Sequence, residues 1–212
     1  MNKQVHVITK INTDKKIVAF TFDDGPNPLY TKQILDIFHE YSSRATFFMI
    51  GEQMKKHPDT VKEVVNGGHE IGNHTFTHPM LTQLNDEECF EEIAATEGII
   101  EQITGNKPNT FRPPYLDYNE HTHAIVQQFG YETIGALNMD AMDWEQPGVE
   151  HIVQKTRNHI QSGSIIIFHD GFGDRSQTVK AVRILVHELL NEGYQLVTIS
   201  ELLKMQTKTI TV

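Results

Sequence analysis

Short runs of β-branched and aromatic residues alternate along this chain with longer segments whose apolar residues recur at helical spacing. Strands are predicted at 16–22, 45–50, 69–73, 132–137, 164–168 and 195–199. Helices are predicted around 34–38, at 59–66, from a capping box at 85–88 to Gly105, and at 120–129, 149–161 and 176–191. Uninterrupted alternation of this kind is typical of a parallel sheet wrapped by helices. The sequence therefore predicts an α/β fold.

The length of 212 residues fits one domain, and a hydrophobic content of 38% is enough to line its core. We predict a main domain over 16–206 and an N-terminal extension over 1–15. Residues 5–11 and 16–22 are two β-branched runs separated by four polar residues. They are predicted to pair as a β-hairpin, with the first run packed on the main domain.

The charge balance argues against polyanionic partners. Lys and Arg number 18 against 28 Asp and Glu, which gives a formal net charge of −10. Phosphate backbones and anionic lipid repel such a chain, so neither nucleic acid nor a membrane is an expected partner. No apolar run reaches signal-peptide or membrane-spanning length, so the chain as written is expected to be cytoplasmic. The single cysteine, Cys89, cannot form an intramolecular disulfide, and the oligomeric state is left open.

Polar residues with catalytic chemistry stand where the extended segments end. They are Asp23 and Asp24, His74, Arg112, Asp143 and His169. The carboxyl ends of parallel strands meet at one edge of the sheet, where such folds bind their ligands. We therefore expect these side chains to converge on one site.

Two adjacent carboxylates and a spaced histidine pair have the residue types of a catalytic metal site. Asp23 and Asp24 cannot both point the same way on an extended backbone, so one can ligate a metal while the other stays free as a base. His74 and His78 are four residues apart, a separation that one transition-metal ion can bridge if the segment turns helically. Three such ligands leave positions open for water and substrate. The simpler alternatives are a surface turn and a chance pair among 12 histidines.

The remaining polar positions suit proton transfer and support. His169 ends a strand that should be buried and can donate a proton, or it can simply cap the backbone. Asp143 lies beside Trp144. The acid is suited to holding an imidazolium in place, and the pair is suited to forming the wall of a sugar pocket. The simpler alternative is a loop acid with no catalytic role. Arg112 precedes two prolines and can reach a carboxylate in a bidentate pair, or make a structural salt bridge.

Together these segments resemble the polysaccharide deacetylase family, also called the NodB-homology domain or carbohydrate esterase family 4. The resemblance rests on TFDDGP at 21–26, HTFTH at 74–78, RPPY at 112–115, DAMDW at 140–144 and IIIFHD at 165–170. It implies a distorted, incomplete (β/α) barrel and metal-dependent removal of N-acetyl, or sometimes O-acetyl, groups from carbohydrate. Carried over by position, it implies Asp24, His74 and His78 as metal ligands, Asp23 as general base and His169 as general acid.

The resemblance also implies supporting residues. Arg112 would support the base and Asp143 the acid. Trp144 and Ile167 would shape the acetyl pocket, and the backbone N–H of Tyr115 would serve as an oxyanion donor. Leu116 departs from the family pattern, because many relatives have glycine after RPPY, and it is expected to make the lip of the cleft narrower or more apolar.

One divalent metal ion is the expected cofactor, with zinc ahead of cobalt, nickel or iron, since Asp-His-His suits all four. The expected substrate is carbohydrate that contains N-acetylglucosamine, either peptidoglycan glycan strands or chitooligosaccharides. Most characterised relatives carry export signals, so the chain as written is expected either to meet its substrate inside the cell or to leave by a route the sequence does not show. Two alternatives stay open: an amidohydrolase for a small non-sugar amide, and a catalytically silent sugar-binding module.

Overall fold

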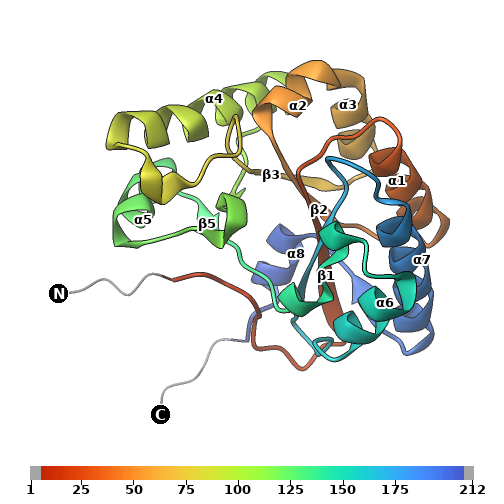
Figure 1. The fold of residues 1–212 in the computed structure, drawn as a ribbon. Coiled ribbons are helices and arrows are strands. Elements are labelled where there is room, and N and C mark those ends of the chain that lie inside the picture. The colour runs from red at the N-terminus through yellow and green to blue at the C-terminus, as the bar shows by residue number, and fades with distance from the viewer. Residues whose placement is uncertain (1–5, 208–212) are drawn as a thin grey trace, which may run out of the picture.

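The structure is a computed structural model that describes residues 6–207, and a parallel sheet lies at its centre (Figure 1). The strands are β1 (Ile17–Asp23), β2 (Thr46–Met49), β3 (Glu70–Asn73), β4 (Thr110–Phe111), β5 (Glu132–Thr133), β6 (Ile165–His169) and β7 (Gln195–Leu196). They pair in the order β5-β4-β3-β2-β1-β6, and β7 joins the first two residues of β1. All these pairings are parallel. The strand–helix alternation therefore gives the predicted sheet.

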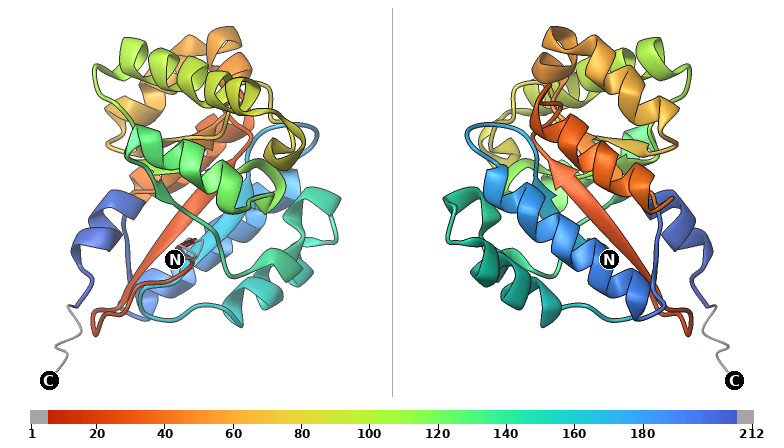
Figure 2. Two further views of the ribbon diagram at one scale, coloured as in Figure 1. Left: turned by 90° about the vertical axis from the view of Figure 1, so that its left-hand side faces the viewer. Right: turned by 90° about the vertical axis from the view of Figure 1, so that its right-hand side faces the viewer.

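The helices lie around the outside of this sheet, which curls into an incomplete barrel (Figure 1). They are α1 (Tyr30–Glu40), α2 (Gly51–Lys56), α3 (Pro58–Asn66), α4 (Asp86–Thr104), α5 (Glu120–Val126), α6 (Val149–Arg157), α7 (Ser176–Asn191) and α8 (Ile199–Lys204). In the right-hand view of Figure 2, α1 and α7 lie side by side over β1. The predicted α/β half-barrel is confirmed. No helix in 6–207 is long and apolar enough to cross a bilayer.

Side-chain alternation along β1 decides what reaches the interior of the barrel. Phe20 and Phe22 point outward and pack with the rings of Phe38 and Phe168, in the core that α1 and α7 cover. Because successive side chains of a strand alternate between its faces, the odd-numbered residues face inward. Asp23, the last residue of the strand, is thereby directed into the barrel at its carboxyl end.

Several helix boundaries follow the predicted capping signals. Asn85 and Glu88 form the expected capping box at the start of α4, and Gly105 ends the helix at φ 75°. Helix α7 spans the predicted residues 176–191. The predicted strand at 195–199 is too long, since Thr198 caps α8 together with Glu201. Helix α2 was not predicted.

The predicted N-terminal hairpin is wrong for the described residues. Ile8 forms a single parallel bridge with Ile134, and Lys10 forms a single antiparallel bridge with Ser164. β1 pairs with β2, β6 and β7 and not with the segment before it, which instead forms its bridges next to β5 and just before β6. Val5 of the predicted first strand lies outside the described residues. The domain boundary at 15/16 stays a prediction.

Candidate active site

A cavity of about 460 Å³ opens at the carboxyl ends of β1, β3 and β6. The predicted site residues that line it are Asp23, Asp24, His74, His78, Tyr115, Trp144, Ile167 and His169. The other two, Arg112 and Asp143, lie behind the lining and contact Asp23 and His169. The structure thus gathers all ten residues at one place, and the roles assigned to them stay predictions.

Asp24, His74 and His78 offer three ligand atoms that all lie within 4.8 Å of one another. Oδ1 of Asp24 is 3.6 Å from Nε2 of His74 and 3.2 Å from Nε2 of His78. Asp24 joins the two histidines because it leaves the extended conformation, with φ at 74°. Both neighbouring carboxylates therefore line one cavity, which an extended backbone would not allow. Among the described residues, no other cluster of three such groups has this geometry.

Hydrogen bonds and burial prepare this triad for a divalent cation. Oδ1 of Asp24 is buried and accepts no hydrogen bond from any residue in 6–207, an arrangement that is costly unless a cation balances it. The Nδ1–H of His74 donates to the carbonyl of Arg112 at 2.7 Å, which leaves the lone pair of Nε2 free. Burial and His74 lower the pKa of His78 to about 4 despite nearby carboxylates, so its imidazole is neutral. Neutral imidazoles and an ionised carboxylate are the forms that ligate metals.

The pKa of Asp24 follows the same electrostatics. Burial alone would raise the pKa of this carboxyl, but the nearby histidines outweigh it, His74 most of all, with help from His169 and His78. The net effect lowers the pKa of Asp24 below its ordinary value. The donor set therefore fits the one divalent ion predicted from the sequence.

A buried guanidinium holds Asp23. Nη1 of Arg112 donates to Oδ1 of Asp23 at 2.6 Å and to Oγ1 of Thr21 at 2.8 Å. Its other nitrogens donate to the carbonyls of Ile134 and Gly135. Arg112 is 0% exposed, so it reaches Asp23 from behind and leaves the cavity side of the carboxylate open. Oδ2 of Asp23 lies 3.7 Å from Nε2 of His74.

Asp143 holds His169 in a similar way. Oδ1 of Asp143 accepts from Nδ1–H of the ring, and Oδ2 accepts from the backbone N–H of His169, both at 2.8 Å. Burial alone would lower the pKa of His169, but Asp143, aided by Asp23 and Asp24, raises it to about 9. The ring is therefore an imidazolium at neutral pH, with Nε2 free for the cavity. Trp144 packs edge-on against it, with 5.2 Å between the ring centroids.

Exposed rings from two tight loops form the mouth of the cavity. Tyr115 is 63% exposed, and its ring lies 4.6 Å from that of His78, between ring centroids. Tyr115 and Leu116 have φ values of 58° and 54°, in the left-handed region, and Leu116 lines the cavity as expected. The N–H of Tyr115 donates to no group within the described residues. Phe172 is 48% exposed, and the centroid of its ring lies 6.4 Å from that of the His78 ring.

Several residues of the site carry no motif signal. Phe172 and Arg175 both line the cavity, and the guanidinium of Arg175 donates to the carbonyls of Gly171 and Trp144. The hydroxyl of Thr178, in the first turn of α7, donates to Oδ2 of Asp143 at 2.9 Å. Threonine is common on protein surfaces and at helix starts, so its presence in the sequence does not predict such a contact. Only the three-dimensional structure reveals these supports.

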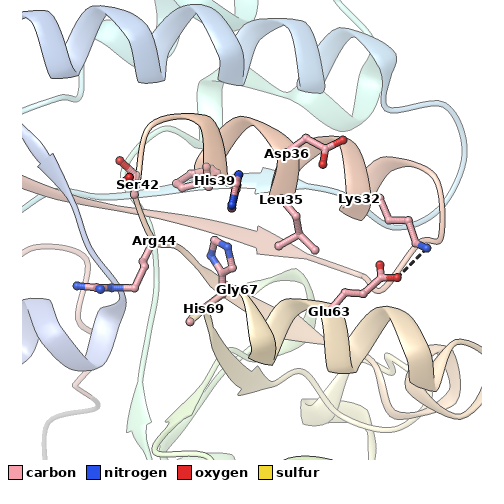
Figure 3. Close-up of a pocket in the computed structure, with 12 residues that line it drawn as sticks. Lys32, Leu35, Asp36, His39, Ser42, Arg44, Glu63, Gly67 and His69 are labelled. Atoms are coloured by element: carbon pink, nitrogen blue, oxygen red, sulfur yellow. Dashed lines mark ion pairs between the residues drawn. The ribbon is translucent and has the colours of Figure 1, made fainter.

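A larger cavity of about 690 Å³ lies between α1 and α3, away from these residues (Figure 3). Lys32 pairs with Glu63 inside the cavity and Arg44 pairs with Glu201 beside it, whereas Asp36 has no ion pair within the described residues. Burial and Arg44 lower the pKa of His69 to about 4, and its Nδ1 accepts from the N–H of Ala45. Within the described residues, this lining therefore contains no cluster of three metal-ligand groups like that of the smaller cavity.

Known proteins were then compared with this chain. The family model described as polysaccharide deacetylase matches residues 10–134. A peptidoglycan-N-acetylglucosamine deacetylase of Bacillus cereus is 41% identical over 200 residues, which are 94% of this chain and 93% of that protein. A chitooligosaccharide deacetylase of Azorhizobium caulinodans is 33% identical over 199 residues, covering 88% of this chain and 94% of that protein.

One solved structure shows that similarity to this family does not by itself establish activity. A CE4-family pseudoenzyme of Bacillus anthracis superposes with a TM-score of 0.86 at 28% identity, covering 96% of this chain and 70% of that chain. Proteins described as enzymes and a protein described as a pseudoenzyme thus have the same fold. Activity has to be argued from the side chains in the cavity.

Proposed function

The chain belongs to the polysaccharide deacetylase family, and from this premise we propose that it hydrolyses N-acetyl groups of carbohydrate that contains N-acetylglucosamine. The observation that carries the proposal is the meeting of a three-ligand cluster, a carboxylate and an imidazolium in one cavity. Peptidoglycan glycan strands are the favoured substrate, because the relative with 41% identity bears that name. Chitooligosaccharides are the second substrate class, after the Azorhizobium relative. The compartment in which the protein acts stays a prediction from the sequence.

The reaction adds water across an amide, giving acetate and a free amine. A divalent ion on Asp24, His74 and His78, zinc first among the candidates, supplies Lewis acidity that polarises a carbonyl and lowers the pKa of water. Asp23 is placed to take a proton from the attacking water on the side that Arg112 leaves open.

Two further groups act on the amide itself. The free N–H of Tyr115 is available to stabilise negative charge on the acetyl oxygen. His169 is placed to give the proton that the departing nitrogen needs. Trp144 and Ile167 close the cavity around the space available for an acetyl methyl group.

The two alternative functions make different use of the same cavity. An amidohydrolase of small amides has no need for exposed aromatic rings at the mouth, where Tyr115 and Phe172 stand. A silent sugar-binding module has no need for both Asp23 and His169, each paired with its own buried counter-charge. These observations favour the deacetylase.

The test measures acetate release from N-acetylglucosamine oligomers and from glycan strands, with zinc content determined on the same samples. We expect release by the native protein, and losses of about 10²–10⁴-fold in Asp23→Asn and in His169→Ala, because each removes one proton-transfer step. Equal release by native protein and variants contradicts these roles. Sugar binding without acetate release would favour the silent module, and release from small non-sugar amides alone would favour the amidohydrolase.

A further inference from the structure

The backbone between the two histidine ligands is held in an unfavourable conformation. Thr75 and His78 both have φ at 66°, in the left-handed region, although neither is glycine. Each such residue costs about 1 kcal/mol and persists only where surrounding contacts fix it. The segment 74–78 has already left the sheet, so strand pairing cannot supply those contacts.

The carbonyls of this segment are bound from one side, at the start of α2. The N–H of Gly51 donates to the carbonyl of Thr75, and the N–H of Glu52 donates to that of Phe76, both at 3.0 Å. Gly51 allows this approach, because a Cβ there would lie 2.5 Å from the ring of Phe76. The α2 contact thus fixes the carbonyls and leaves the N–H groups to other partners.

A single carboxylate on α4 binds those N–H groups. Oε2 of Glu92 accepts from the N–H groups of Phe76 and Thr77, both at 2.8 Å, and Oε1 accepts from the hydroxyl of Thr77 at 2.7 Å. Hydrogen bonds to an ionised acceptor are about twice as strong as neutral ones. Asn73 adds one contact at the strand end, where its side-chain oxygen accepts from the N–H of Thr75. Within the segment, Oγ1 of Thr75 also accepts from the N–H of His78 at 3.1 Å. Among the described residues outside 73–78, Glu92 is therefore the one side chain that hydrogen-bonds to the middle of the segment.

We propose that Glu92 is a positioning residue that sets the spacing of His74 and His78 for the metal ion. The proposal rests on the metal site of the proposed function. Glu92 does not line the cavity, so it acts through the backbone of the histidine segment rather than on substrate. Its anchor is α4, which is itself fixed to β3 by the hydrogen bond from the Asn73 amide to the carbonyl of Ile93. Without the hydrogen bonds to Glu92, the backbone of the strained segment is free to relax. The imidazoles of His74 and His78 are then free to move apart.

The test compares Glu92→Ala and Glu92→Gln with the same two changes at Glu91. Glu91 is exposed on the same helix, and its side chain has no hydrogen bond or ion pair with the rest of residues 6–207, so it is a matched control. Zinc affinity is measured by competition with a chelator, and amide hydrogen exchange is followed in the zinc-free protein. Circular dichroism checks that each variant folds.

We expect Glu92→Ala to weaken zinc binding by about 10–100-fold, as is typical when a support of metal ligands is lost. Glu92→Gln keeps one acceptor oxygen and should fall between Glu92→Ala and the native protein. The amides of Phe76 and Thr77 should exchange faster in both Glu92 variants and stay as in the native protein in the Glu91 variants. Unchanged zinc affinity and unchanged exchange in Glu92→Ala would overturn the proposal. If Glu92→Ala fails to fold, the isosteric Glu92→Gln decides by the same two measurements.

These outcomes separate the inference from the proposed function. A native protein that binds zinc but releases no acetate leaves the positioning role intact and removes the deacetylase. A native protein that binds no zinc contradicts the metal site and with it the role of Glu92.

Discussion

Replacing Asp143 by asparagine should move the alkaline limit of activity, because Asp143 is the largest cause that raises the pKa of His169 to about 9. Asparagine keeps the shape of the side chain but removes the charge that faces Nδ1 at 2.8 Å. In the variant, burial lowers the pKa of His169 and only the charges of Asp23 and Asp24 oppose it, so we take the ordinary imidazole pKa of about 6.5 for this variant.

The size of the effect follows from the two pKa values. At pH 8 about 90% of the native His169 is protonated, against about 3% in Asp143→Asn, whereas at pH 5.5 about 90% or more is protonated in both. A folded-state pKa above the ordinary value means that the acid is present below that pKa and lost as pH rises through it. The ratio of native to variant kcat/KM should therefore grow about 30-fold between pH 5.5 and pH 8. If the imidazole of His169 also loses its orientation in the variant, the ratio of native to variant kcat/KM rises by a further factor that does not depend on pH.

The assay is acetate release by zinc-loaded protein at half-unit steps of pH. Asp140→Asn is the matched control, because Asp140 lies in the same loop but pairs with His159 and Lys155 at the surface. That variant should keep the native profile. A native-to-variant ratio for Asp143→Asn that does not change with pH would refute the role of His169 as a general acid tuned by Asp143.

Three further predictions concern metal, substrate and stability. Asp24→Asn should lose zinc on dialysis against a chelator, because a neutral amide is a weaker ligand than a carboxylate. Its zinc-free form should unfold at a lower temperature than the native apoprotein at neutral pH, since the folded state lowers the pKa of Asp24 and so favours its charge; a higher thermal transition contradicts this. Phe172→Ala should raise KM for oligosaccharide about fivefold with kcat nearly unchanged, because one exposed ring contact is lost, whereas the exposed Phe90→Ala should not. Burial and Arg44 lower the pKa of His69 to about 4, so the native state binds fewer protons than the unfolded chain between that pH and about 6.5. The free energy of unfolding should fall by up to about 3 kcal/mol as pH drops through this window. In His69→Gln, the urea midpoint should depend less steeply on pH than in the native protein.

The fold was largely predictable because its signals are local. Strand–helix alternation, the Asn85 capping box and the αL position of Gly105 depend on residues close in sequence. The prediction failed where two local signals overlapped. The β-branched run 195–199 indicated a strand, but Thr198 and Glu201 form a capping box there, and the helix begins at Ile199.

The sequence predicted which motif residues gather in the cavity, but not which residues support them. Asp24 and His169 stand in compact motifs, where residue type and spacing restrict the chemistry. The supporting contacts of Thr178, Arg175 and Glu92 join segments far apart in sequence, and each of these residues is a common helix or surface type. The sequence contains no local pattern for such contacts, because only the packing of α4 and α7 against the barrel creates them.

The arrangement of counter-charges explains how an acid and a base can share one cavity. Asp23 meets Arg112 through one oxygen, and His169 meets Asp143 through Nδ1, in both cases on the side away from the cavity. Each reacting group thus has a buried partner of opposite charge behind it and one free atom in front. Arg112 follows β4 and Asp143 lies in the chain after β5, so each support comes from a different part of the chain than the residue it holds, and each also binds the strand of that residue, at Thr21 in β1 and at the backbone of His169 in β6. A direct proton transfer from His169 to Asp23 would leave the buried charges of Arg112 and Asp143 without their counter-charges, so these two buried partners oppose that transfer.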